Sequence, residues 1–390
     1  MGPHLPLGHQ TGRLALAGRD FLTERLDALR AAGNLRRLPG NPAGIDFWSN
    51  DYLGFSRLLG RGHASELVHT APGSRLISGD HPAISGLEAD IAAFHGFPAA
   101  LLFGSGYSAN LGLLSCLARR TDTIVYDELI HASLRDGIRL SGAAARRCPH
   151  NSLVQAARIL TAARGDGQTF FVTESRFSMD GDRAPLAELA DLCHHHGAHL
   201  IVDEAHAIGL DGPSGAGLVA QLGLAGAVFA TVVTYGKAPG YHGAAVLGSN
   251  DLRDYLINFS RPFIFTTAPR PAYVTGLREV YDLMGTQQPE LRQQLQRVIE
   301  GYRSLATEHL GELAAPNDGP IQLVHLPGNE RVMALEGHLR ERGLLVKAIR
   351  SPSVPPGTER LRICLHAFNS VGEVEQLIDG LTTGLAKISA

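Results

Sequence analysis

The chain has 390 residues, of which 44% are hydrophobic and 19% charged, and its formal net charge is −3 at pH 7. This composition is typical of a globular protein, and the length favours two or three structural units. The charge balance lacks the basic excess of a nucleic-acid-binding protein, and no apolar run is long enough to cross a bilayer. We therefore expect neither nucleic acid nor a membrane as a partner.

The four cysteines are far apart in the sequence, and no Cys-x-x-Cys pair occurs (Cys116, Cys148, Cys193 and Cys364). This spacing predicts neither a disulfide framework nor a zinc knuckle. Three consecutive histidines, His194 to His196, would point in different directions on a helix, so we expect no metal site there. The N-terminus has no basic segment followed by an apolar one, and a cytoplasmic location is expected.

The predicted elements begin with an amphipathic helix over residues 14–38, a short strand over 45–48 and a helix over 84–95. From residue 99 on, apolar runs alternate with helical segments. The strands are predicted over residues 100–103, 123–126, 169–173, 199–202, 228–234 and 244–247. The helices between them are predicted over residues 107–118, 131–141, 153–163 and 185–196. This alternation predicts an α/β fold with a mainly parallel sheet, and the last two strands, which no helix separates, predict one antiparallel member.

A long helix is predicted from residue 271 through 290 to 310, and the remaining chain reads as a smaller α/β unit. Its strands are predicted over residues 321–325, 344–349 and 361–365, and its helices over 331–342 and 371–388. We therefore predict an N-terminal helical segment over residues 1–48, a large domain over 49–285 and a small C-terminal domain over 286–390.

Polar residues follow several of the predicted strands, at the edge where open parallel sheets bind their ligands. One of them, Lys237, follows the apolar run that ends at Thr234. A lysine between apolar strands is partly desolvated, and this favours its neutral, nucleophilic amine. The pattern suggests a lysine that carries pyridoxal phosphate as a Schiff base. The alternative is a hairpin whose lysine extends to water.

Asp203 ends another apolar run and is followed closely by His206. A buried carboxylate is costly unless it is paired with a cation, and a protonated pyridine nitrogen would be such a partner. His206 would then bond the phenolic oxygen of the cofactor and move protons. A helix N-cap or a structural ion pair is the alternative for Asp203.

Gly104-Ser105-Gly106 lies between a strand and a helix, which is typical of a phosphate cradle. With Ala109 it also fits the dinucleotide fingerprint, and Asp127 lies at a suitable distance for a ribose. A nicotinamide-dependent oxidoreductase is therefore an alternative, although it leaves Lys237 without a role. Arg362 alternates with apolar neighbours, so it either extends to water or binds a carboxylate.

Together these residues resemble the α-oxoamine synthases, fold-type-I pyridoxal-phosphate-dependent transferases that condense an amino acid with an acyl thioester and release CO2. The resemblance runs from about residue 35 to the C-terminus. Its motifs are Ser49-Asn50-Asp51-Tyr52-Leu53-Gly54, Gly73-Ser74-Arg75, Ser105-Gly106-Tyr107, His131-Ala132-Ser133, Thr173-Glu174-Ser175, Phe177-Ser178-Met179-Asp180-Gly181-Asp182, Asp203-Glu204-Ala205-His206 and Thr234-Tyr235-Gly236-Lys237. The segment 348–362 is most similar to the family member that acts in biotin biosynthesis.

The resemblance implies that Lys237 carries pyridoxal 5'-phosphate, that Asp203 pairs with its ring nitrogen and His206 with its phenolic oxygen, and that His131 stacks on the ring. These four are the expected catalytic residues. The other expected cofactor contacts are Ser105, Gly106, Tyr107, Glu174, Ser178, Thr234, Thr266 and Thr267. The expected substrate contacts are Arg36, Asn50, Ser353 and Arg362.

The implied substrates are L-alanine and a pimeloyl thioester of coenzyme A or of a carrier protein. The implied assembly is a homodimer in which Thr266 or Thr267 reaches the partner's phosphate. A sister activity (glycine C-acetyltransferase or serine palmitoyltransferase) and a catalytically silent dimer are alternatives. The chain departs from the family at Pro239, where leucine is common, and at Ile84 and Ser85, near a position where biotin-pathway members often have histidine.

Overall fold

The structure is a computed structural model that describes residues 27, 30–33, 44–49, 51–58, 73–163, 167–315 and 317–389. It divides into two compact units, Met1–Gly44 and Ile45–Ala390. In the first unit, Asp27, Arg30 and Ala31 are helical, and most of the helix predicted over residues 14–38 lies outside the described residues. Every element and contact described below belongs to the second unit.

The second unit contains a seven-stranded sheet with the order β2-β8-β7-β6-β5-β3-β4. The strands are β2 (Ala99–Phe103), β3 (Thr123–Asp127), β4 (Ala144–Cys148), β5 (Thr169–Glu174), β6 (His199–Asp203), β7 (Ala230–Thr234) and β8 (Ala244–Gly248). Strand β8 pairs antiparallel with both of its neighbours, whereas the other paired strands run parallel. The predicted mainly parallel sheet with one antiparallel member is confirmed.

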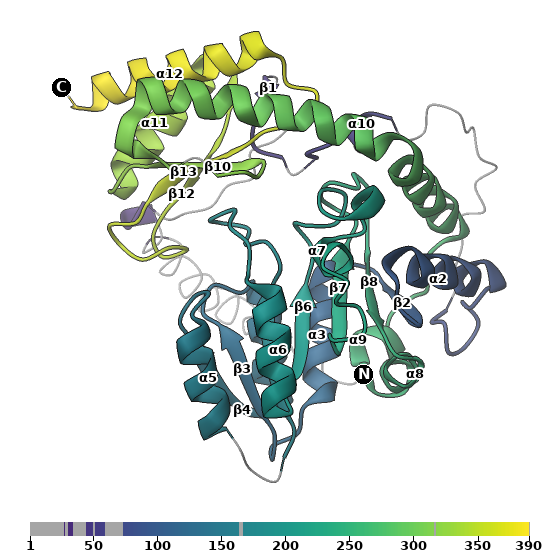
Figure 1. The fold of residues 1–390 in the computed structure, drawn as a ribbon. Helices are drawn as coiled ribbons and strands as arrows, with labels where there is room; N and C mark the ends of the chain where they lie inside the picture. Colours follow the sequence, from purple (N-terminus) through teal and green to yellow (C-terminus); the bar gives the residue numbers. More distant parts are fainter. Residues whose placement is uncertain are drawn as a thin grey trace, which may run out of the picture. The chain divides into compact units, whose positions relative to one another are not determined.

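Helices cover both faces of this sheet: Figure 1 shows α6 in front of it and α3 behind it. The α-helices are α2 (Pro82–His95), α3 (Gly106–Leu117), α4 (Ala132–Ser141), α5 (Leu153–Ala162), α6 (Leu186–His196), α7 (Leu218–Gln221), α8 (Asn250–Phe259) and α9 (Arg261–Ile264). Short 3-10 helices are η1 (Phe55–Arg57) and η2 (Pro213–Gly215). Helix α3 packs on α4, and α5 packs on α6. Because both faces are covered, β2, β7 and β8 consist of buried residues throughout.

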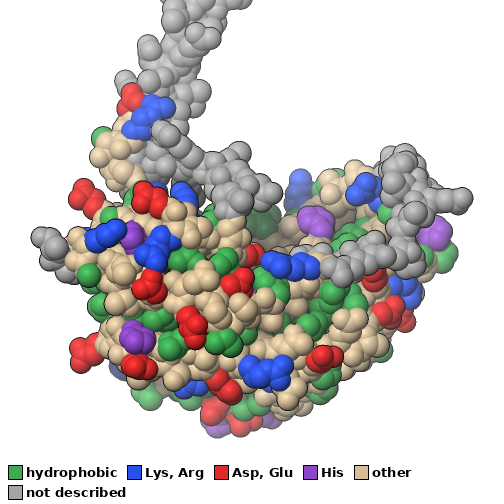
Figure 2. Space-filling model, turned by 90° about the horizontal axis from the view of Figure 1, so that it is seen from above, with side chains coloured by type: hydrophobic (Ala, Val, Ile, Leu, Met, Phe, Trp, Pro, Cys, Tyr) green, Lys and Arg blue, Asp and Glu red, His purple; other side chains and the backbone are tan. Residues whose placement is uncertain are grey.

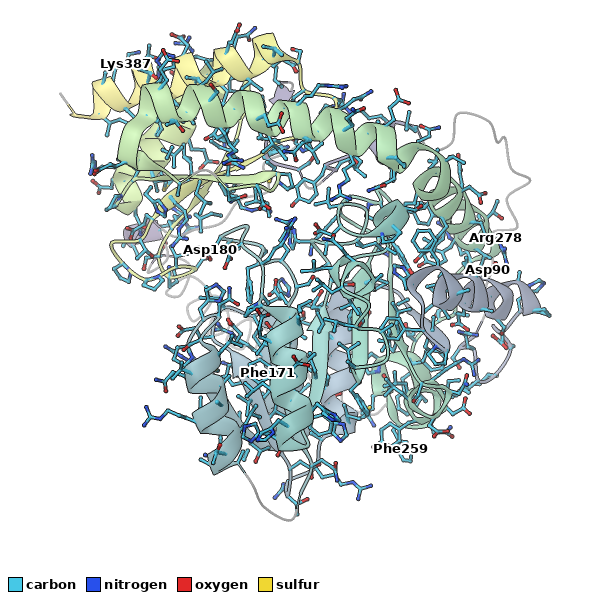
Figure 3. The ribbon with its side chains drawn as sticks, in the orientation of Figure 1. Asp90, Phe171, Asp180, Phe259, Arg278 and Lys387 are labelled. Carbon is cyan, nitrogen blue, oxygen red and sulfur yellow. The ribbon has the colours of Figure 1, made fainter. Side chains whose placement is uncertain are left out.

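The 40-residue helix α10 (Pro271–Leu310) connects the large sheet to a four-stranded antiparallel sheet of order β12-β13-β10-β9. Near its start, Arg278 of α10 donates to Asp90 of α2 over 2.6 Å (Figure 3). The remaining elements are η3 (Gly311–Leu313), β9 (Ala314–Ala315), β10 (Ile321–His325), α11 (Asn329–Glu341), β12 (Lys347–Ile349), β13 (Arg360–Cys364) and α12 (Val371–Ser389). The predicted smaller α/β unit is therefore present, with α11 and α12 packed together and α12 also packed on α10.

Two strand predictions were wrong in detail. The strand predicted over residues 344–349 is divided, because β11 (Leu344–Leu345) pairs with β1 (Ile45–Asp46) while β12 pairs with β13. Strand β4 was not predicted at all: it is an edge strand whose first four residues are exposed, so it lacks the alternation of a half-buried strand. The proposed domain boundary at residues 285–286 falls inside α10 and stays a prediction.

Basic, acidic and hydrophobic side chains are interspersed over the visible face in Figure 2. Within the described part of the chain, no helix combines the length and apolar character that a bilayer span requires.

Candidate active site

The carboxyl ends of β5, β6 and β7 surround a cavity of about 290 Å³. This volume lies near the lower end of the range for small-molecule sites, about 300–1,000 Å³. It is lined by these residues predicted from the sequence: Ser105, Gly106, Tyr107, His131, Glu174, Ser178, Asp203, His206, Thr234 and Lys237. The structure therefore brings together side chains that are up to 132 positions apart in the chain, from Ser105 to Lys237 (237 − 105).

Two buried carboxylates lie side by side in this cavity, because Glu174 of β5 is in register with Asp203 of β6. Asp203 accepts hydrogen bonds from the backbone N–H of Ala205 (2.8 Å) and from the Asn110 amide (2.7 Å). Glu174 accepts from the backbone N–H of His131 over 2.6 Å. Burial and the charge of Asp203 raise the pKa of Glu174 to about 8, so its carboxyl group readily holds a proton.

Lys237 is half-buried in the loop between β7 and β8, and its side chain lines the cavity with both carboxylates. Burial lowers the pKa of its amine, although Asp203 and Glu174 oppose this shift. The direction matches the neutral, nucleophilic amine expected from the sequence. The turn that carries Lys237 is closed by the N–H of Gly240, which donates to the Lys237 carbonyl over 2.8 Å. The missing N–H of Pro239 therefore costs this turn no hydrogen bond.

The imidazole of His206 is buried, and its Nδ1 lies 3.0 Å from the hydroxyl of Tyr52. Burial, followed by the charges of Lys237 and Arg362, lowers the pKa of His206 well below its ordinary value, so the ring is neutral. Arg362 is buried as well; it donates to the Tyr52 hydroxyl (3.3 Å) and to the carbonyl of Ser178 (2.7 Å). Arg362 therefore does not extend to water, and its charge acts on the cavity.

One end of the cavity has the features of an anion site. Ser105 caps α3 by accepting from the N–H of Ser108, and the N–H groups of Gly106 and Tyr107 have no acceptor within the helix. The hydroxyl of Thr234, only 7% exposed, also lacks a partner among the described residues. Buried hydroxyl groups are normally hydrogen-bonded, so this atom indicates a ligand. A phosphate here, with Lys237 and Asp203 farther along the cavity, fits pyridoxal phosphate.

The comparisons with known proteins show the family of this chain. Residues 42–381 match the family model "Aminotransferase class I and II". The chain belongs to this family. The 8-amino-7-oxononanoate synthase of Alkalilimnicola ehrlichii is 40% identical over 94% of this chain and 97% of its own. The 8-amino-7-oxononanoate synthase structure from Francisella tularensis has a TM-score of 0.73 at 29% identity, over 89% of this chain and 99% of that chain. The structure of serine palmitoyltransferase from Sphingomonas wittichii has a TM-score of 0.84 at 27% identity, over 96% of this chain and 98% of that chain.

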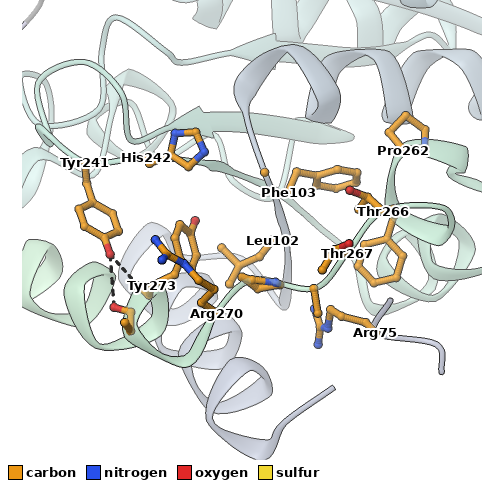
Figure 4. A pocket seen from close by; sticks show the side chains of 15 residues that line it. Arg75, Leu102, Phe103, Tyr241, His242, Pro262, Thr266, Thr267, Arg270 and Tyr273 are labelled. Carbon is orange, nitrogen blue, oxygen red and sulfur yellow. Dashed lines mark hydrogen bonds between the residues drawn. The ribbon is translucent and has the colours of Figure 1, made fainter. Parts of the chain in front are cut away.

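Two predicted cofactor contacts, Thr266 and Thr267, do not line the cavity that holds the others. They line a neighbouring cavity of about 490 Å³. Figure 4 shows them across the cavity from Tyr241, whose hydroxyl donates to the carbonyl groups of Ala272 and Tyr273. His242 lines both cavities, so the two adjoin.

Of the remaining predicted substrate contacts, Ser353 is exposed in the turn before β13. Arg36 and Asn50 lie outside the described residues. Asp127, the candidate ribose ligand of the nicotinamide alternative, accepts from the backbone N–H groups of Leu129 (2.8 Å) and Asn151 (2.9 Å) and pairs with His150. This engagement and the family match argue against a nicotinamide site.

The sequence analysis gave no role to several residues at the cavity, among them Asn110 and Ser133, and gave none to Tyr52. Asn110 carried a usable signal. Asparagine is a poor helix former, and position 110 lies one turn after Gly106 on the helix that begins at the cavity.

Proposed function

We propose that the protein is a pyridoxal-phosphate-dependent transferase that condenses L-alanine with a pimeloyl thioester to form 8-amino-7-oxononanoate. One observation carries the proposal: the amine of Lys237 and the carboxylate of Asp203 line one cavity beside the unpaired hydroxyl of Thr234. The name of the relative from Alkalilimnicola ehrlichii supports the choice of product.

In the overall reaction, a carbon–carbon bond forms between the α-carbon of alanine and the thioester carbonyl carbon, and the thiol leaves. The alanine carboxylate leaves as CO2. One proton is removed from the α-carbon before the bond forms, one is returned to it after CO2 leaves, and the leaving thiolate takes up another. When bound, pyridoxal phosphate supplies an electron-withdrawing ring that stabilises negative charge at the α-carbon.

The residues of the chain have the remaining roles in this reaction. Asp203 would hold a bound cofactor at its ring nitrogen and keep that nitrogen protonated, and His131 would cover the ring. Thr234, with the N–H groups of Gly106 and Tyr107, would hold the phosphate. Ser105 keeps those N–H groups oriented through its cap on α3. Ser178 lines the same site.

Lys237 moves the proton at the α-carbon, because its lowered pKa increases the share of neutral amine near pH 7. His206, which is neutral, would hold the phenolic oxygen of the bound cofactor and assist the return of the proton. Glu174 holds the backbone of His131 in place. Arg362 and Asn50 bind the alanine carboxylate, and Arg36 and Ser353 bind the acyl chain.

The protein acts as a homodimer in this proposal, and Thr266 or Thr267 binds the phosphate in the partner's site. The cavity that they line supports this arrangement, because it adjoins the active site through His242. The four free cysteines support a reducing compartment, which we propose is the cytoplasm.

Replacing Lys237 tests the proposal. The purified wild-type protein should bind pyridoxal phosphate with visible absorbance that changes on addition of L-alanine. Lys237→Ala should lose both the turnover and the absorbance of the lysine-bound cofactor, because no other amine lines the described cavity. Lys387→Ala, which changes an exposed lysine on α12 (Figure 3), is the control and should behave like wild type.

Normal turnover by Lys237→Ala would refute the assignment. Binding of NAD(H) without a chromophore would instead favour an oxidoreductase, and bound cofactor without a response to alanine would favour a silent dimer.

A sister activity is the second candidate, because the serine palmitoyltransferase structure has the higher TM-score of the two structures compared, 0.84 against 0.73. Sequence identity favours the synthase: 40% to the relative against 27% to the palmitoyltransferase. Assays of alanine, glycine and serine against pimeloyl, acetyl and palmitoyl thioesters separate the candidates. We expect alanine with the pimeloyl thioester to give the highest kcat/KM.

A further inference from the structure

We propose that Asn110 is a positioning residue that orients the carboxylate of Asp203 and connects it, through Ser133, to the imidazole of His131. This inference rests on the proposed function, because its purpose is to prepare Asp203 and His131 for the cofactor. Asn110 lies on α3, Ser133 and His131 lie at the start of α4, and Asp203 ends β6.

The contacts form a continuous chain of hydrogen bonds. The Asn110 amide nitrogen lies 2.7 Å from Asp203 Oδ2 and 3.0 Å from the Ser133 hydroxyl. That hydroxyl lies 2.8 Å from Nδ1 of His131. Asn110 and Ser133 are 2% and 0% exposed, so water does not compete for these bonds.

The direction of each hydrogen bond follows from the groups involved. The backbone N–H of Ser133 can only donate, and it lies 3.2 Å from His131 Nδ1, so Nδ1 is an acceptor. The proton of neutral His131 is therefore on Nε2, and the Ser133 hydroxyl donates to Nδ1. The hydroxyl oxygen then accepts from one N–H of Asn110, and the other N–H of Asn110 donates to Asp203.

This arrangement explains the orientation of a buried carboxylate. Asp203 receives one bond at each oxygen, from Ala205 at Oδ1 and from Asn110 at Oδ2. These two donors fix the plane of the carboxylate. The Oδ1 atom of Asn110 is buried and has no partner among the described residues, so the amide is held by its two donated bonds. A purely structural asparagine would more often satisfy this oxygen as well.

The affinity for pyridoxal phosphate tests the proposal without relying on turnover. Asn110→Leu removes both donors at similar volume, and we expect the dissociation constant of the cofactor-free full-length protein to rise about 10- to 100-fold, the range for one bond to a charged group. Ser133→Ala leaves the bond to Asp203 intact, so its affinity should fall less. At saturating cofactor, Asn110→Leu should also change the position or the pH midpoint of the visible absorbance band.

Leu113→Ala is the matched control, because Leu113 is a buried core residue of the same helix that does not line the cavity. It should destabilise the fold yet keep wild-type affinity and absorbance. Wild-type affinity and absorbance in Asn110→Leu would overturn the inference. If the wild-type protein itself binds no pyridoxal phosphate, the proposed function fails as well.

A second measurement needs no change at Asn110 and therefore holds if that variant does not fold. Nitrogen-15 NMR of the cofactor-free wild-type protein should show His131 with its proton on Nε2 and Nδ1 unprotonated. A proton on Nδ1 would break the chain of hydrogen bonds and contradict the proposal. In Ser133→Ala the Nδ1 signal should shift, because its hydroxyl donor is lost.

Discussion

Gly106 begins α3 at the cavity, at a position with no room for a methyl group. A Cβ atom there would lie 2.5 Å from the side-chain methyl of Thr234, whereas a Cβ at Gly104 would meet nothing within 4 Å. Gly106→Ala should therefore displace Thr234, weaken pyridoxal phosphate binding and lower the free energy of unfolding by about 1–3 kcal/mol. Gly104→Ala is the control. Cofactor titration and urea unfolding measure both variants, and equal behaviour of the two would argue against the contact.

Short motifs contain much of the information at the residue scale. Asp203 ends an apolar strand and Lys237 follows another, so the sequence alone placed them in one cavity, as the structure does. Asn110 and Tyr52 were missed as functional residues because their roles depend on distant partners. Tyr52 contacts His206 and Asn110 contacts Asp203, across 154 and 93 positions of the chain. A local pattern can mark Asn110 as unusual in a helix, but it does not identify the partner of either residue.

At the element scale, the segment after β5 connects the two sheets. Asp180 pairs with Arg360 of β13, and Asn317 donates to the backbone carbonyl groups of Asp180 (3.4 Å) and Ile321 (2.7 Å). The same segment carries Ser178, whose carbonyl accepts from Arg362. The position of Arg362 relative to the cavity therefore depends on this segment.

Gly181→Ala tests that dependence. Gly181 has φ +75°, and a Cβ there would lie 2.8 Å from the backbone oxygen of Ile321; Gly197 at the end of α6 has φ +64° and nothing within 4 Å. Both alanine variants carry the left-handed strain of about 1–2 kcal/mol. Only Gly181→Ala also displaces the segment. This displacement should lower the free energy of unfolding by about 2 kcal/mol more and raise KM for alanine. Urea unfolding and steady-state kinetics compare the two variants. An equal KM for alanine would show that the position of Arg362 does not depend on the segment.

The elements themselves were predictable to the extent that burial controls their sequence. Strands β5, β6 and β7 are buried and apolar, and their predicted positions are confirmed to within two residues. Strand β4 has the sequence Ala-Ala-Arg-Arg-Cys, and its pairing with β3 comes from the backbone rather than from an apolar face. The division between β11 and β12 depends on β1, almost 300 residues earlier (344 − 45 = 299), so no local pattern signals it.

At the scale of the whole molecule, His150 links the loop before α5 to the segment that joins the sheets. Its Nδ1 lies 3.0 Å from Asp127, and its Nε2 lies 2.8 Å from Asp182. The side chain of His150 is 22% exposed, and the edge of its ring packs against Phe177. The imidazolium therefore lies between two carboxylates from separate parts of the fold.

This arrangement predicts a stability that depends on pH. Burial opposes the charged form of His150, but the hydrogen bonds to Asp127 and Asp182 outweigh it and raise the pKa from 6.5 to about 10. The pKa of His150 is higher in the folded protein than in the unfolded chain. Its charge therefore contributes fully to the free energy of unfolding below about pH 6.5, and this contribution is lost as pH rises through about 10. His150→Gln should lower the free energy of unfolding by about 2 kcal/mol at pH 6, after allowance for solvent screening, and by much less at pH 10.5.

Urea unfolding of both proteins at the two pH values measures this difference. The exposed His194→Gln on α6 is the control and should match wild type throughout. If His150→Gln lowers the free energy of unfolding equally at pH 6 and pH 10.5, the imidazole acts by packing against Phe177, since packing does not titrate. If this loss is smaller at pH 10.5, the charge of His150 joins Asp127 to Asp182. Through Asp182, His150 then holds the segment that carries Ser178 at the cavity.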